Sequence, residues 1–183
     1  MLFRSSPDGE MLLFLRLTPE TALDIWSVPL DGSADPKPLM SAKENEILPS
    51  FSPDGRWLVY ESDKTGRYEI YVRPFPDIER REWRISSGGG DDARWAAVPG
   101  ELFYRDGPRI YSVKYVSDPD FEPAPPELVL TTDFHNSAGL SFDVSADGSR
   151  FLVNRPVVAG QPVPPDRKST RLNSSHSSVS RMP

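Results

Sequence analysis

Few side chains in this sequence could perform acid–base, nucleophilic or metal chemistry. The chain has two histidines and no cysteine, which excludes disulfides, thiol nucleophiles and zinc–thiolate sites. His176 lies in a serine-rich end, and His135 has no partner at the spacing of a zinc motif such as HExxH. No GxSxG motif supplies a serine nucleophile. We therefore expect His135 to be a loop residue, and we predict no catalytic residue, no metal site and no cofactor.

The glycine-rich segment Gly88–Asp92 has the composition of a phosphate or calcium loop but not the pattern of either. A P-loop would continue with Lys-Ser or Lys-Thr, and a calcium loop would place its acids at alternate positions rather than side by side. We favour a turn between two structural repeats.

Three aspartates recur in the words SPDG at residues 6–9, SPDG at 52–55 and SADG at 145–148. They could line a channel or bind a cation. However, proline presets the second position of a type I turn, aspartate accepts local N–H bonds, and glycine tolerates positive φ. We therefore favour hairpin turns. The predicted turn residues are Pro7, Asp8, Gly9, Pro53, Asp54, Gly55, Gly100, Asp147 and Gly148.

These turns are part of a longer repeat. The glycines at 9, 55, 100 and 148 lie about 45 to 48 residues apart, although the third turn, at 97–100, is one residue short and lacks Asp-Gly. A second short motif, in which isoleucine precedes an aromatic residue, recurs at 24–28, 69–73 and 109–113. Trp57–Tyr60 has no polar alternation, which is typical of a strand covered on both faces. Four short strands per period are typical of β-propeller blades.

The predicted fold class is therefore all-β: a partial β-propeller of about three and a half four-stranded antiparallel blades over residues 1–155. The fourth repeat is expected to contain only its inner and second strands. Such an open propeller leaves unpaired strands, so we expect a fragment of a larger propeller. Trp26, Tyr71 and Tyr111 recur at one position and could bind a peptide or glycan, but we favour packing between blades.

The end of the chain differs from the repeats. A proline-rich segment at 156–165 precedes DRKSTRLNSSHSSVSRMP at 166–183, which has no strand pattern. This segment resembles translated sequencing-adapter tails, and the alternative is a natural disordered tail. We expect it to be disordered and exclude it from the fold. The acidic stretch Asp118, Asp120, Glu122 and Glu127 is expected to be a solvated excursion, or else an exposed docking strip.

Composition limits the partners. The net charge of −6 and the lack of a basic cluster argue against nucleic-acid binding. No apolar run is long enough to span a membrane, and no targeting signal is present, so the compartment is unassigned.

In order, the words PSFSPDGRWLVYES, GRYEIYVRPFPD and FDVSADGSRFLVN resemble the WD-like propeller at the carboxyl end of bacterial serine/threonine protein kinases. They are also similar, more loosely, to the TolB-type periplasmic propeller. The resemblance covers residues 1–155. It implies a propeller that follows a kinase domain, often after a membrane span, on the extracytoplasmic side. This chain contains no kinase motif of its own.

We therefore expect a non-catalytic binding or sensor module whose blade loops and axial face contact a protein, a peptide or a small ligand. One alternative is the propeller of a prolyl oligopeptidase-like peptidase that lacks its hydrolase domain. Another is a TolB-type envelope assembly protein.

Overall fold

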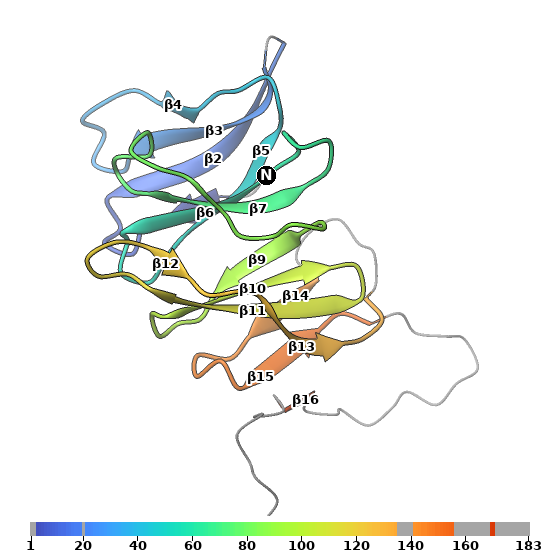
Figure 1. Cartoon of the computed structure of the whole chain (residues 1–183). Helices are drawn as coiled ribbons and strands as arrows, with labels where there is room; N and C mark the ends of the chain where they lie inside the picture. Colours follow the sequence, from blue (N-terminus) through green and yellow to red (C-terminus); the bar gives the residue numbers. More distant parts are fainter. Residues whose placement is uncertain (1–2, 20, 135–140, 156–168, 171–183) are drawn as a thin grey trace, which may run out of the picture.

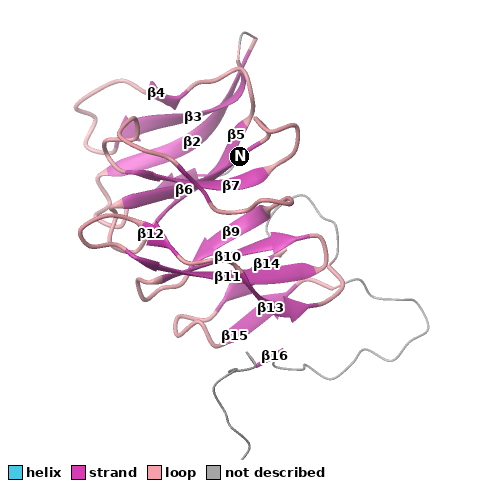
Figure 2. Cartoon of the chain, in the orientation of Figure 1, coloured by secondary structure: helices cyan, strands magenta, loops and turns pink. Residues whose placement is uncertain are grey.

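The computed structural model describes residues 3–19, 21–134, 141–155 and 169–170, which form four stacked antiparallel sheets (Figure 1). None of these residues is helical (Figure 2). The expectation of an all-β partial propeller is confirmed, and each sheet is one blade. His135 and His176 lie outside the described residues, as do 156–168 and 171–183.

The blades follow the order of the chain. Blade 1 contains β1 (Phe3–Ser5), β2 (Met11–Thr18), β3 (Ala22–Pro29) and β4 (Lys37–Met40). Blade 2 contains β5 (Glu46–Phe51), β6 (Trp57–Ser62), β7 (Glu69–Pro74) and β8 (Trp83–Arg84). Blade 3 contains β9 (Asp91–Trp95), β10 (Glu101–Asp106), β11 (Arg109–Val116), β12 (Glu122–Pro123) and β13 (Glu127–Thr131). Blade 4 contains β14 (Phe142–Val144), β15 (Arg150–Val153) and β16 (Ser169–Thr170).

The first strands of the blades lie together, although each belongs to a different sheet. β1 contacts β5, β5 contacts β9, and β9 contacts β14. They therefore form one side of the stack, which is where the axis of a propeller lies. We call it the axial side.

The hairpin between the first and second strands has one geometry in blades 1, 2 and 4. In blade 2, the Gly55 N–H donates to the Ser52 carbonyl at 2.9 Å. The Ser52 hydroxyl donates to the Asp54 carboxylate at 2.5 Å and accepts the Trp57 N–H at 3.0 Å. Gly55 has a φ of 71°. The corresponding bonds and positive glycine φ angles occur at residues 6–9 and 145–148.

The turn of blade 3 departs from this geometry. It shows that Gly100 is not equivalent to Gly9, Gly55 and Gly148, as the sequence alignment had assumed. The N–H groups of Leu30 and Phe75 donate to the carbonyls of Glu10 and Arg56, each one residue past the turn glycine. The equivalent bond in blade 3 runs from Tyr115 to Gly100 itself. Gly100 therefore occupies the position of Arg56 rather than that of Gly55. The expectation that the third turn is one residue short is wrong, because the Ala96 N–H donates to the Glu101 carbonyl five residues on, as the Ser52 N–H does to the Trp57 carbonyl. The turn has the usual length and carries its glycine one position later.

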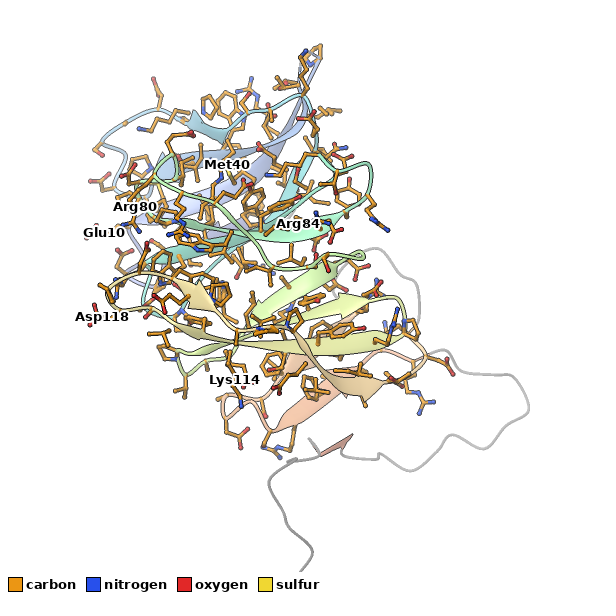
Figure 3. All side chains as sticks on the ribbon, viewed as in Figure 1. Glu10, Met40, Arg80, Arg84, Lys114 and Asp118 are labelled. Atoms are coloured by element: carbon orange, nitrogen blue, oxygen red, sulfur yellow. The ribbon has the colours of Figure 1, made fainter. Side chains whose placement is uncertain are left out.

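Apolar side chains fill the space between successive blades (Figure 3). All six residues of β6 are buried, as expected for a strand covered on both faces. The third strands of blades 1, 2 and 3 carry an aromatic residue at the same position, namely Trp26, Tyr71 and Tyr111. Each lies directly opposite an aromatic residue of the second strand of its blade. The pairs and their centroid separations are Phe14–Trp26 at 6.4 Å, Tyr60–Tyr71 at 5.6 Å and Tyr104–Tyr111 at 5.3 Å.

The aromatic pairs of blades 2 and 3 face the preceding blade, so the favoured packing role of Tyr71 and Tyr111 is confirmed. The Tyr60–Tyr71 pair belongs to one core cluster with Leu13 and Ile25 of blade 1. Tyr104 belongs to a second cluster, with residues of blade 2, and Tyr111 packs against it.

Asp118, Glu122 and Glu127 are exposed, as expected for the acidic stretch, and Asp120 is half-buried. Between them, Phe121 is 1% exposed and packs against Trp57, Trp83 and Tyr115, which the sequence did not indicate. One expectation about the peripheral segments needs correction. The fourth repeat contains more than two strands. β16 pairs with β15 through Arg150–Thr170 and Phe151–Ser169, although no strand pattern marked this part of the sequence.

Candidate functional site

Four equivalent residues, one on the first strand of each blade, have polar or charged side chains. Each of them pairs with the third residue of its blade's second strand. They are Arg4, Ser50, Arg94 and Asp143. Two cations, a hydroxyl and a carboxylate thus occupy one level of the axial side.

Just beyond this level, a buried chain of hydrogen bonds joins blades 2, 3 and 4. The Asp92 N–H donates to the Glu61 carboxyl at 2.7 Å, and the Ser141 N–H donates to Asp92 Oδ2 at 3.0 Å. The Ser141 hydroxyl also donates to Asp92 Oδ2. All three side chains are buried. We refer to Glu61, Asp92, Arg94 and Ser141 as the axial cluster.

Glu61 is held in its neutral form near pH 7. Burial, together with the charges of Asp91 and Asp92, raises the pKa of its carboxyl to about 8, against the hydrogen bond from the Asp92 N–H and the charge of Arg94. A protonated carboxyl can donate a hydrogen bond as well as accept one. The Glu61 carboxyl can therefore act as a hydrogen-bond donor or as an acceptor.

Arg94 has spare hydrogen-bonding capacity. Its Nη2 lies 3.9 Å from Asp92 Oδ1 and is buried without a hydrogen-bond partner among the described residues. Burial lowers the pKa of the guanidinium, while Asp92 opposes this and Arg4 adds to it. Arg4 belongs to blade 1 and Arg94 to blade 3, so both cations act on the same axial region.

A second ion pair fixes the strand that carries the cluster. Arg105 donates to the two carboxylate oxygens of Asp91 at 2.6 and 2.9 Å, a bidentate arrangement. Its Nε also lies 3.7 Å from Asp92 Oδ2. Burial raises the pKa of Asp91, and the bonds from Arg105 oppose that rise. This contact orients the first residues of β9.

The predicted turn residues do not join the axial cluster. Pro7, Asp8, Gly9, Pro53, Asp54, Gly55, Asp147 and Gly148 lie in hairpin turns, and Gly100 directly precedes β10. The segment Gly88–Asp92 divides, because its glycines form the connection between blades while Asp91 and Asp92 begin β9. Sequence reasoning therefore missed Glu61, Arg94 and Ser141. The one available signal was the pair of adjacent acids at the start of an inner strand.

The axial cluster brings charged and hydrogen-bonding groups together where blades 2, 3 and 4 meet. In the described part of the chain, no group of three or more histidine, cysteine, aspartate or glutamate side chains could hold a metal ion. That part also contains no helix that could cross a membrane.

No protein-family model matches the chain. An uncharacterized protein of Agrobacterium fabrum is 25% identical over 155 residues, which cover 82% of this chain and 48% of that protein. TolB from Acinetobacter baumannii superposes with a TM-score of 0.55 at 19% identity, covering 81% of this chain and 36% of TolB.

Two further solved structures are similar. A puromycin-hydrolyzing peptidase of Mycobacterium tuberculosis gives a TM-score of 0.62 at 19% identity, covering 82% of this chain and 27% of the peptidase. The β-propeller domain of the Trilobed protease from Pyrococcus furiosus gives 0.52 at 20%, covering 82% and 48%. The chain thus spans about half the length of the curated relative and half or less of these structures. In fold, it is a TolB-like β-propeller.

Proposed function

We propose that the chain is a non-catalytic binding module whose axial side recognises a protein or peptide through a carboxylate. The observation that carries this proposal is Arg94, whose buried Nη2 has no hydrogen-bond partner in the described part of the chain. A carboxylate is the complementary group for a guanidinium, because two oxygens accept its N–H groups in parallel. Glu61, neutral at pH 7, does not repel such a ligand.

We further propose that this module is the carboxyl-terminal propeller of a receptor-type bacterial serine/threonine protein kinase, on the extracytoplasmic side. The order of the words SFSPDGRWLVYES, GRYEIYVRPFPD and FDVSADGSRFLVN supports this proposal. A sensor outside the membrane requires a binding surface, and the proposal assigns that surface to the axial cluster.

A second candidate is the propeller of a prolyl oligopeptidase-like peptidase. The likeness in fold to the puromycin-hydrolyzing peptidase favours it. TolB-type envelope assembly is supported in the same way by the likeness to TolB. Sequencing the source DNA across both ends of the reading frame separates these proposals. HRD and DFG motifs upstream support the kinase, and a GxSxG motif downstream supports the peptidase.

The binding proposal is tested by selecting peptides from a display library on the purified chain and measuring their affinity by calorimetry. We expect selected peptides to carry an aspartate, a glutamate or a free carboxyl terminus. Arg94→Gln should weaken binding by about tenfold or more, since it removes a charge-assisted bidentate contact. The matched control is Arg56→Gln, at an exposed position of the blade 2 hairpin.

Equal losses in the two variants would overturn the assignment of the axial side. Cleavage of a bound peptide, detected by mass spectrometry, would overturn the non-catalytic part of the proposal.

A further inference from the structure

Two buried carboxyl groups lie where blade 1 meets blade 2. Asp24 in β3 is 1% exposed, and Glu46, the first residue of β5, is 6% exposed. Asp24 Oδ1 and Glu46 Oε2 are both buried without a hydrogen-bond partner among the described residues. The other oxygen of Asp24, Oδ2, accepts hydrogen bonds from the hydroxyls of Thr18, Thr21 and Ser41 at 2.5 to 3.4 Å. Each carboxyl therefore keeps one buried oxygen that can accept a further contact.

The two carboxyls belong to one site, although they come from different blades. The Ala42 N–H donates to the Glu46 carboxyl, and Ala42 directly follows Ser41, which donates to Asp24. The negative charge of Asp24 also contributes to raising the pKa of Glu46, as expected for two acids in one buried region. We call Asp24 and Glu46 the interblade acid pair.

The equivalent site between blades 2 and 3 shows how such a carboxyl is neutralised. Cross-strand pairing makes Glu69 the equivalent of Asp24. Glu69 Oε2 accepts a hydrogen bond from the Ser86 hydroxyl, as Asp24 Oδ2 does from that of Ser41. Glu69 Oε1 accepts a second bond from the guanidinium of Arg84 (labelled in Figure 3) at 2.7 Å. A cation thus contacts the oxygen that has no described partner in Asp24.

The site between blades 1 and 2 differs from this counterpart at two positions. In blade 1, Pro38 pairs with the third strand where Arg84 does in blade 2. Glu46 replaces Gly90, because the residues that follow them pair with equivalent residues of the second strands. A Cβ on Gly90 would lie 2.7 Å from the Ser86 hydroxyl, so this position adjoins the carboxyl site. The two changes remove one positive charge and add one carboxyl.

We propose that the interblade acid pair binds a calcium ion. Buried carboxylates require a cation or a proton to compensate for their desolvation. Calcium takes roughly six to eight oxygen ligands in a flexible geometry, whereas magnesium demands a near-ideal octahedral shell and retains several waters. With two acidic ligands, the site would complete its shell with hydroxyl or backbone carbonyl oxygens and water. The sequence predicted no metal site because Asp24 and Glu46 follow no metal-binding motif.

Protonation of Glu46 competes with the ion. Burial raises the pKa of Glu46 to about 7, with Asp24 adding to the rise and Arg73 and Lys64 opposing it. Both of these cations also contact Glu82, so neither is dedicated to Glu46. Because calcium binds the ionised carboxyl, its affinity should be about tenfold higher at pH 8 than at pH 6. The inference is independent of the ligand proposed for the axial side.

The first test is calorimetric titration of the full chain, previously treated with EDTA, with calcium chloride at pH 6 and pH 8. Repeating the pH 6 titration in buffers of different ionisation enthalpy measures the proton that Glu46 releases. At pH 8, calcium at about a hundred times its Kd should raise the melting temperature by about 5 °C or more. Magnesium at the same concentration should raise it less.

Two variants test the ligands. Asp24→Asn and Glu46→Gln should each weaken calcium binding by about tenfold or more, since each removes a charge and keeps the shape of the side chain. Asp35→Asn and Glu10→Gln are the matched controls at exposed positions of blade 1, and they should bind calcium as the parent chain does. Circular dichroism checks that each variant is folded.

The parent chain alone can overturn the proposal, which does so if calcium leaves its melting temperature unchanged at pH 8. An equal effect of magnesium would overturn it as well, because it would indicate general screening of charge. Affinities that are equal at pH 6 and pH 8, or unchanged in Glu46→Gln, would show that Glu46 is not a ligand. Parent-like affinity in Asp24→Asn would remove the other ligand from the site.

Discussion

At the scale of single residues, the Ser-x-Asp-Gly turn satisfies its own polar groups. The serine hydroxyl donates to the aspartate and accepts a backbone N–H from the second strand, while the aspartate accepts an N–H two residues on. The hydrogen bond from Ser145 lowers the pKa of Asp147 to about 2, with help from Ser149. These local bonds explain why the residue types alone indicated the turn. Gly100 was placed one residue off because the third turn has the same length as the others but carries its glycine one position later, so aligning the glycines shifts the register.

Gly55→Val should destabilise the chain by at least about 1 kcal/mol, since Gly55 has a φ of 71°, where a β-branched residue is strained. A Cβ there would lie 3.7 Å from Pro7, an ordinary contact, so the cost arises from the backbone. Denaturant unfolding measures the loss. Gly88→Val is the control, because Gly88 has neither a positive φ nor a neighbour within 4 Å of a Cβ. Unchanged stability in Gly55→Val would contradict the turn geometry.

At the scale of elements, strands were predictable and their polar links were not. Unbroken apolar runs such as Trp57–Tyr60 identify strands buried on both faces. The bonds from Glu61 to Asp92 and from Asp92 to Ser141 join residues far apart in sequence, and they depend on how three blades stack. Arg94 has the same origin, because only the stacking brings Arg4 and Asp143 near it.

The pKa of Glu61 predicts how stability changes with pH. In the folded chain it is about 8, against an ordinary value of 4.5. Between these values the folded state retains a proton that the unfolded state has released, so stability falls as pH rises from about 4.5 through 8. If the folded and unfolded pKa values differ by one, the stability changes by about 1.4 kcal/mol. Glu61→Gln cannot ionise, and its stability should therefore fall less over this range.

Denaturant unfolding at pH 5, 7 and 9 checks this prediction. Some dependence should persist, because burial also raises the pKa of Glu46 to about 7. The exposed Glu10 (Figure 3) provides a control, as Glu10→Gln should leave the profile of the parent chain unchanged. A Glu61→Gln profile as steep as that of the parent would show that Glu61 is not the titrating group.

At the scale of the whole molecule, the recurrence of the turn and strand motifs in the sequence was enough to predict stacked blades. It did not predict β12 or β16, which are two-residue strands made by residues without strand character. Phe121 was missed for a similar reason, since a single aromatic residue among acids and prolines has no periodicity. Its burial depends on aromatic rings of blades 2 and 3, which meet around it only in the folded chain.

Truncation after Pro165 removes β16 and with it two residue pairs to β15. Among the residues that the structure describes, none beyond Val153 belongs to a core cluster, so we expect the strand signal in circular dichroism to remain and the melting temperature to change little. A cooperative loss of strand signal would show that the serine-rich end is structural.

The recurring aromatic pair has a consequence for how such chains diversify. Because the aromatic pair recurs on the same face of blades 1, 2 and 3, a gene that gains or loses one such repeat by unequal recombination needs no new interface. Repeat number can then drift faster than the residues at the blade contacts, and selection acts separately on the copy number and on the axial side chains.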